Sequence, residues 1–406
     1  MTYVPSGEHL ERYANLLVNF ALGGGQGIRA GEVVRVIAPD SAKPLFAAAC
    51  RAVWRAGGHV IADLRASDDQ HCNLSRDFFE LASDEQLEHF PERYWRGVID
   101  EVDHALHIDS VSDPHALASI PPERIMRRRA SMLPLVRWQQ AKEDAGRFSW
   151  TIALYGHEAM AAEAGLSIED YWGQIIAACF LDDPDPVARW REIETQIARH
   201  CSFLDSLPIE RLHLEAEGTD LWLTLGERRR WIGGGGRNIP SYEVFTSPDW
   251  RGTEGTVSFS EPVYVYGSLI EGVALEFREG RVVRASARRG EELLREMIAT
   301  AGADRVGEFS LTDGRLSRIT HFMADTLYDE NTGGPRGNTH LALGRSLRVC
   351  YAGDPTKVGE DEWERLGFNE SSVHTDIVST TERTVTALLD DGTRRVIYAD
   401  GRFLDD

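Results

Sequence analysis

The most constraining feature of the sequence is a strand–helix–strand unit near its beginning. The run VVRVIAP at residues 33–39 is short, apolar and rich in β-branched residues, which is typical of a buried strand. Residues 43–56 are predicted to form a helix, and HVIADL at residues 59–64 the next strand. Consecutive strands joined by a helix pair in parallel, so this unit predicts a parallel sheet with helices packed against it.

The rest of the chain divides into two regions of different character. Residues 8–22 have apolar side chains near helical spacing, segments 103–109 and 148–155 resemble further strands, and residues 158–206 are helical in pattern. After Pro208, short alternating segments separated by glycine dominate. We therefore expect an α/β fold, with an N-terminal α/β domain at residues 1–207 and a strand-rich α+β catalytic domain at residues 208–406.

Several classes of function are disfavoured by the composition. The glycine-rich stretch Gly23–Gly27 precedes the first strand, whereas a dinucleotide fingerprint follows a strand and opens a helix, so we predict no nucleotide cofactor there. A formal charge of −21 argues against a nucleic-acid partner, which requires clustered basic residues. No apolar run approaches the ~20 residues that span a bilayer, so no membrane association is expected.

The cysteines and the N-terminus indicate a compartment. The five cysteines are scattered and form no CxxC pair, which argues against a disulfide framework or a thiolate metal site. The first residues are polar and then amphipathic, unlike a secretory signal. We expect a cytoplasmic protein.

Acidic residues and histidines in the second region stand in unusual local settings. They lie in apolar, strand-like runs or beside glycine-rich loops, where charged side chains are seldom found without a partner. These candidate residues are Glu243, Glu308, Glu330, His340, His374 and Asp376.

His374 and Asp376 form the most compact pair among these candidates. Side chains two residues apart on a strand point to the same face, so an imidazole and a carboxylate would lie together as half of a metal site. A hydrogen-bonded buried pair, and for His340 a core histidine, are the alternative interpretations. Several buried carboxylates near one another are costly without a cation, however, and a nitrogen and oxygen ligand set without cysteine suits Zn²⁺, Co²⁺ or Mn²⁺.

The order of the motifs carries a resemblance that covers essentially the whole chain. NxPxxEVFTSP, then GE, then LYDEN followed by THLALG, then HxD resembles the thermophilic aminopeptidase family that includes aminopeptidases T and S. The resemblance implies a two-domain, dimeric exopeptidase that holds a pair of divalent metals and acts on peptides with a free N-terminus.

The resemblance also implies roles for matched positions. Glu243, His374 and Asp376 correspond to metal ligands, Glu308 to a carboxylate that touches both metals, and Glu330 and His340 to residues near the metals. Glu308 and Glu330 are the candidates for catalytic carboxylates. One departure is Leu347, because the family pattern has a tyrosine there and leucine cannot donate a hydrogen bond. Tyr351 is the nearest residue that could replace that hydroxyl.

Two other functions are compatible with these residues. A non-haem iron dioxygenase of the related fold, which cleaves hydroxylated pyridine rings, needs only two histidines and one carboxylate, and His340, His374 and Asp376 would suffice. The other is a peptide-binding homologue with weakened turnover, which Leu347 suggests.

Overall fold

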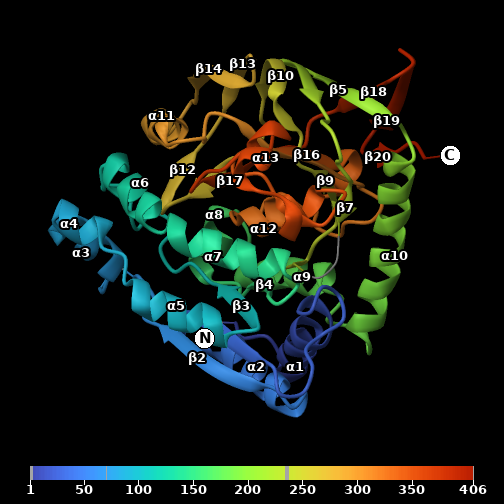
Figure 1. Cartoon of the computed structure of the whole chain (residues 1–406). Coiled ribbons are helices and arrows are strands. Elements are labelled where there is room, and N and C mark those ends of the chain that lie inside the picture. The colour runs from blue at the N-terminus through green and yellow to red at the C-terminus, as the bar shows by residue number, and fades with distance from the viewer. Residues whose placement is uncertain (1–2, 70, 234–236, 406) are drawn as a thin grey trace.

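The N-terminal part of the protein is built on a parallel sheet. The computed structural model describes residues 3–69, 71–233 and 237–405. The strand order of this sheet is β2-β1-β3-β4-β8, with helices packed on it (Figure 1). The strands are β1 (Val33–Pro39), β2 (His59–Arg65), β3 (His104–Asp109), β4 (Ser149–Leu154) and β8 (Asn238–Ile239). The parallel pairing of β1 with β2 across an intervening helix confirms the predicted strand–helix–strand unit.

The helices of this part follow the sequence pattern closely. Ser6 caps the first of them, because its hydroxyl accepts the amide N–H of His9 at 3.1 Å. The helix α10 is long and runs along one side of the molecule toward the strand-rich part (Figure 1). The helices are α1 (Gly7–Leu16), continued by a π-helical turn (Leu17–Ala21), α2 (Lys43–Arg55), α3 (Leu74–Leu81), α4 (Asp84–Glu88), α5 (Glu92–Glu101), α6 (Pro122–Ser131), α7 (Leu133–Asp144), α8 (Glu158–Glu163), α9 (Ile168–Ala178) and α10 (Pro186–Asp205).

Among the described residues, the C-terminal part contains two larger antiparallel sheets and a hairpin. One sheet has the order β14-β13-β10-β6-β5-β18-β19-β20, and β11 pairs with β12 in the hairpin. These strands are β5 (Ile209–Ala216), β6 (Thr219–Thr224), β10 (Asp249–Ser258), β11 (Val263–Val265), β12 (Ser268–Ile270), β13 (Ala274–Arg278), β14 (Arg281–Ser286), β18 (Arg383–Leu389), β19 (Arg394–Ala399) and β20 (Arg402–Phe403). The strand-rich character predicted for this part is confirmed.

The other large sheet lies at the centre of the molecule. Its order is β17-β16-β15-β9-β7, and every residue of β15 and β16 is buried. The strands are β7 (Ile232–Gly233), β9 (Glu243–Thr246), β15 (Val306–Thr312), β16 (Asn338–Gly344) and β17 (His374–Ser379), and the helices of this part are α11 (Glu291–Ala299), α12 (Thr326–Asp329) and α13 (Glu360–Arg365).

The two parts meet at β8 and β9. Asn238 pairs with Ile152 of β4, so the chain returns to the parallel sheet just before it enters β9. Tyr242 lies between them, fully buried, and its hydroxyl donates to the carbonyl of Ala178 at 2.6 Å. A domain division at residues 207 and 208 remains a proposal, because β8 lies beyond that point and still belongs to the parallel sheet.

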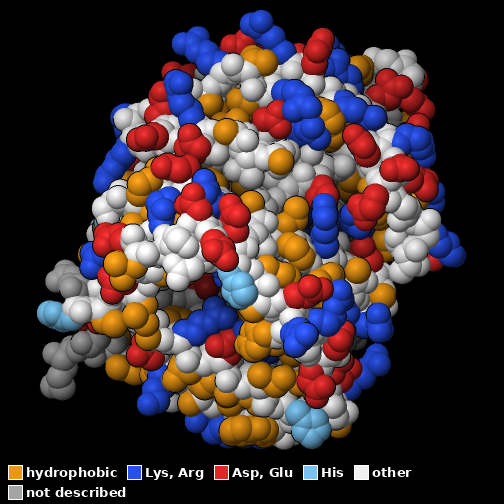
Figure 2. Space-filling view, turned by 60° about the vertical axis from the view of Figure 1, so that its left-hand side comes forward, with side chains coloured by type: hydrophobic (Ala, Val, Ile, Leu, Met, Phe, Trp, Pro, Cys, Tyr) orange, Lys and Arg blue, Asp and Glu red, His pale blue; other side chains and the backbone are white. Residues whose placement is uncertain are grey.

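The surface carries charges of both signs. On the face shown in Figure 2, basic and acidic side chains lie close together over the upper part, and hydrophobic side chains gather toward the lower part. Among the described residues, no helix is both long and apolar enough to cross a bilayer.

Candidate metal centre

Strand register places the predicted site residues on one face of the central sheet. Directly paired residues on neighbouring strands project to the same face, as do residues two apart on one strand. Glu308 and Asp376 both pair with Ala342, on the strand between them. The same register places the remaining candidates on the common face, which carries Glu243, Glu308, His340, His374 and Asp376. The predicted alignment of His374 with Asp376 is confirmed.

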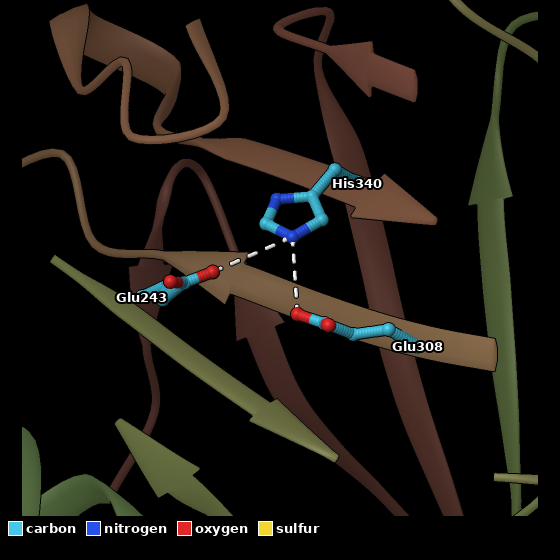
Figure 3. A group of neighbouring side chains, drawn as sticks. All are labelled: Glu243, Glu308 and His340. Atoms are coloured by element: carbon cyan, nitrogen blue, oxygen red, sulfur yellow. Dashed lines mark hydrogen bonds and ion pairs between the residues drawn. The ribbon is translucent and has the colours of Figure 1, made fainter. Parts of the chain in front are cut away.

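Glu308 lies between the two histidines. Its Oε1 is 3.3 Å from Nε2 of His340, and its Oε2 is 3.3 Å from Nε2 of His374. Glu243 approaches the same His340 nitrogen from β9, at 3.4 Å, so three side chains from three strands point at one another (Figure 3). Asp376 is 3.6 Å from His374 and 3.9 Å from His340. Each Glu308 oxygen thus faces a different imidazole.

The orientation of His374 is fixed by its other ring nitrogen. Nδ1 of His374 lies 2.7 Å from the backbone carbonyl of Arg345, which can only accept, so Nδ1 carries the proton. Nε2 of a neutral His374 is therefore an open lone pair directed at Glu308 and Asp376, the arrangement that orients a metal-ligating histidine.

The cluster combines three carboxylates with two histidines in a largely buried place, so its own side chains supply too little positive charge. Burial opposes the ionised form of Glu308, yet hydrogen bonds from His340 and His374 lower its pKa to about 2. The pKa of Glu243 rises to about 7 through burial and then the charge of Glu308. Despite burial, the contact with Glu308 and the neighbouring carboxylates raise the pKa of His340 to about 9. The chain's own side chains thus need extra protons to balance the charge of this cluster.

These groups meet the requirements of divalent cations. Within the described residues, two sets of ligand atoms lie within 4.8 Å of one another, and they share Glu308: one adds Glu243 and His340, the other His374 and Asp376. Oδ1 of Asp376 is buried without a hydrogen-bond partner in the described chain. A buried carboxylate oxygen without a donor is costly unless a cation compensates it. The residues therefore fit divalent-metal binding, and Glu308 belongs to both candidate sets.

Glu330 lies at the same cavity but outside both sets of ligand atoms. One of its oxygens accepts from the side-chain amide of Asn238 at 3.3 Å. Burial, followed by the charges of Asp376 and Glu243, raises the pKa of Glu330 well above its ordinary value. The ligand role predicted for Glu330 remains a prediction.

The neighbours of Glu330 in the DEN motif serve the structure. Asp329 accepts the amide N–H groups of Met323 at 2.6 Å and Asp325 at 3.0 Å, which closes the loop before α12. Asn331 accepts the amide of Tyr242 at 2.5 Å and so ties this motif to the start of β9. The motif thus holds Glu330 and β9 in place together, a division of roles that its sequence did not reveal.

The cluster opens into a cavity of about 810 Å³ between the two parts of the chain. Side chains from the parallel-sheet part and its helices line one wall, and the candidate metal ligands line the other. Lining residues that the sequence did not single out include Asp109, Trp150, Arg237, Tyr264, Tyr266, Asp325 and Arg345. Only their place in the fold identifies them, because they lie in unremarkable local patterns.

Leu347 faces this cavity, and its backbone amide donates to the hydroxyl of Ser247 at 2.8 Å. Tyr351 lies elsewhere: it is buried in a small cluster with Trp363 and Phe368, and its ring is 5.1 Å from that of Trp363. The described cavity lining does not include Tyr351, so the structure does not support its hydroxyl as a replacement for the missing one.

Comparisons with known proteins agree over the full length of the chain. The thermophilic metalloprotease family, M29, matches residues 6–403. Aminopeptidase T of Thermus thermophilus is 31% identical and aminopeptidase PepS of Streptococcus thermophilus 27% identical, with coverage of 98% of each chain for the first and 97% for the second. The solved structure of wild-type AmpT from Thermus thermophilus superposes with a TM-score of 0.79, at 27% identity, over 98% of this chain and 99% of that chain.

A more distant structure shares the fold alone. A 2,5-dihydroxypyridine dioxygenase from Pseudomonas putida KT2440 has a TM-score of 0.50 at 14% identity, over 99% of this chain and 98% of that one.

Proposed function

Because the chain belongs to the thermophilic metalloprotease family, M29, we propose that it removes N-terminal residues from peptides at a centre of two divalent metal ions. It is a metal-dependent aminopeptidase, and therefore a hydrolase. The number of metals, the residues that hold them and the division of catalytic labour are our proposals.

The position of Glu308 is the single observation that carries the two-metal proposal. Its two oxygens face different histidines at 3.3 Å, and it belongs to both sets of ligand atoms. Glu243 and His340 would hold one ion, His374 and Asp376 the other, and Glu308 would bridge them. Nitrogen and oxygen donors without cysteine suit Zn²⁺, Co²⁺ or Mn²⁺.

The chemistry follows from this donor set. Divalent ions held by these residues would polarise the peptide carbonyl and lower the pKa of a water molecule toward ~7. The carboxylates of the cavity neutralise the α-ammonium group of the substrate, which restricts binding to a free N-terminus. The buried walls exclude other water from the reacting bond.

Glu330 is our proposed proton carrier. Its carboxyl group lies on the cavity beside the cluster without belonging to either set of ligand atoms. Asn238 holds one oxygen at 3.3 Å, and bound cations would offset the neighbouring carboxylates that raise the pKa of Glu330, so its other oxygen would take the proton of the attacking water and return it to the leaving amine.

The dioxygenase alternative is less well supported. An iron site of two histidines and one carboxylate leaves Glu243 and Glu308 without a role, although both are buried and directed at His340. The likeness to the pyridine dioxygenase is one of fold.

Assays on one preparation distinguish the three functions. Metal-depleted protein is reconstituted with Zn²⁺, Co²⁺, Mn²⁺ or Fe²⁺ and given leucinamide, a leucyl peptide and 2,5-dihydroxypyridine. We expect hydrolysis of the leucyl substrates and no ring cleavage. Ring cleavage with Fe²⁺ alone would establish the dioxygenase, and peptide binding without hydrolysis under any metal would establish the weakened homologue.

We further propose that the protein acts as a homodimer in the cytoplasm. The cytoplasmic location is supported by the cysteines, all five of which are free thiols in this structure. The dimer is supported by the family resemblance, and sedimentation of the purified protein tests it.

A further inference from the structure

A side chamber branches from the main cavity beside the candidate metal ligands. It has a volume of about 230 Å³ and lies between α7 and the segment that follows β16. Arg237, Arg345 and Leu347 line both the chamber and the main cavity, so they stand where the two join. The chamber walls also include apolar side chains, among them Phe148, Trp150, Ile152 and Val349. A substrate at the metal cluster therefore has a second space open to it, with two arginines at its entrance.

Arg345 is a cation of this chamber that has no partner among the described residues. Arg237 forms an ion pair with Glu143 at 2.6 Å, and Arg348 forms one with Glu360 at 3.1 Å. The guanidinium of Arg345 has no hydrogen bond, ion pair or ring contact with any described residue. Burial lowers the pKa of Arg345, although the charge of Glu143 opposes this. A partly buried guanidinium without a partner is costly unless a ligand supplies the opposite charge.

The backbone of Arg345 is fixed beside the candidate metal ligand His374. Its amide donates to the carbonyl of Val373 at 2.8 Å, and its own carbonyl accepts Nδ1–H of His374 at 2.7 Å. The side chain therefore starts beside a proposed metal ligand and reaches toward the chamber. Arg345 lines the same cavity as His374 and Asp376, so a ligand that contacts both the candidate metal ligands and this guanidinium must fit within that cavity, where one or two extended residues span about 3.5–7 Å.

The acidic groups nearby leave Arg345 available. Glu143 is taken by Arg237, and Asp144 accepts from Gln140 at 2.9 Å. Asp109 also lines the chamber. The pKa of Asp325 is raised to about 7, first by the burial of Asp325 and then by the charge of Asp109, so Asp109 lies toward Asp325, which precedes α12. A guanidinium presents paired N–H donors that match the two oxygens of a carboxylate.

We propose that Arg345, supported by Arg237, forms a carboxylate subsite that makes this enzyme prefer short peptides with a carboxylate within about two residues of the scissile bond. The carboxylate is the C-terminus of a dipeptide or tripeptide, or the side chain of an acidic second residue. This inference rests on the proposed aminopeptidase function and names its substrate class.

Matched substrates test the subsite. The value of kcat/KM is measured for two pairs of substrates. The first pair is leucyl-glycine and leucyl-glycinamide. The second pair is leucyl-aspartic acid α-amide, whose side-chain carboxylate is free, and leucyl-asparagine amide. A charge-assisted pair in a partly buried site favours the charged member by roughly tenfold or more. A preference in the first pair identifies the C-terminus as the source, and one in the second pair identifies the side chain. Equal values within both pairs overturn the subsite, while loss of activity on all four substrates overturns the aminopeptidase function instead.

Variants assign the preference to its residue. Arg345→Gln is expected to bring the ratio of the preferred pair close to one, and Arg345→Lys to keep part of it, because the ammonium retains the charge without the planar fork. The control is Arg295→Gln on α11, an exposed arginine paired with Glu291 at 2.6 Å, which removes the same charge far from the chamber and keeps the ratio. A ratio that survives Arg345→Gln contradicts the assignment.

Binding without turnover supplies an independent reading. Chelator-treated protein is titrated calorimetrically with leucyl-glycine and with leucyl-glycinamide. The wild-type protein is expected to bind the acid at least about tenfold more tightly than the amide, and Arg345→Gln to lose that difference. If Arg345→Gln fails to fold, Arg345→Lys and the wild-type ratios decide, since identical affinities of wild type for acid and amide exclude the subsite.

Discussion

Replacing Glu308 by glutamine tests the centre at the residue on which both proposed metals depend. The ionised carboxylate faces His340 and His374, each at 3.3 Å, and its pKa of about 2 means that the substitution removes a real charge at neutral pH. Contacts of a charged group are worth about 1.5–3 kcal/mol each, so losing two amounts to ~3–6 kcal/mol, or about 10²–10⁴-fold in kcat/KM. The shape of the side chain is nearly preserved, and the fold should persist.

The assay compares hydrolysis of leucinamide, bound metal by mass spectrometry and thermal melting for wild type and variant. Glu292→Gln is the matched control, because Glu292 is an exposed residue of α11 and its change should alter stability by no more than about 0.5 kcal/mol. We expect Glu308→Gln to lose turnover and metal, and the control to keep both. Wild-type turnover and metal content in Glu308→Gln would refute the bridging role.

Other changes probe the remaining parts of the site and the fold. Glu330→Gln should lower kcat about 10²–10⁴-fold while bound metal stays at the wild-type level, which metal analysis beside the assay would check. Leu347→Tyr should raise kcat by up to ~10²–10³ with little change in KM if it restores an oxyanion donor, and unchanged kcat would exclude that role. Tyr351→Phe should leave kcat unchanged, because its ring lies outside the cavity lining. The pKa of Glu32 lies below its ordinary 4.5, since the backbone N–H of Arg29 and the ring of His104 outweigh burial. A carboxyl group whose pKa is lowered by folding stabilises the fold at pH values above its pKa in the unfolded chain. Glu32→Gln should therefore cost roughly 1 kcal/mol at pH 7. In denaturant titrations, this difference should vanish as the pH falls below 4.5 and through the pKa of the folded state.

The elements that local pattern specifies were predictable from sequence. The run at 33–39 became β1 with the predicted bounds, because a short segment rich in β-branched apolar residues is typical of a buried strand. The alternation that aligned His374 with Asp376 is a property of the strand itself and needed no knowledge of its neighbours.

Features that depend on distant pairing were not predictable. Strand β8 is only Asn238–Ile239, and its place beside β4 depends on contacts with residues far along the chain. Arg345 follows the THLALG motif directly, yet its exposure to the cavity depends on how the two parts of the chain meet. In the DEN motif, the sequence offered three polar neighbours, and only the packing separates Glu330, which faces the cavity, from the other two.

The central claim is that two metals share Glu308, and the number of metals bound tests it most directly. Chelator-treated wild-type protein is titrated with Zn²⁺ or Co²⁺ in a calorimeter while leucinamide hydrolysis is followed on matched samples, and Glu308→Gln is titrated alongside. We predict about two equivalents per wild-type chain, with full activity only after the second, and impaired uptake of both by Glu308→Gln. Full activity at a single equivalent, or two equivalents bound normally by Glu308→Gln, would contradict a centre bridged by this residue.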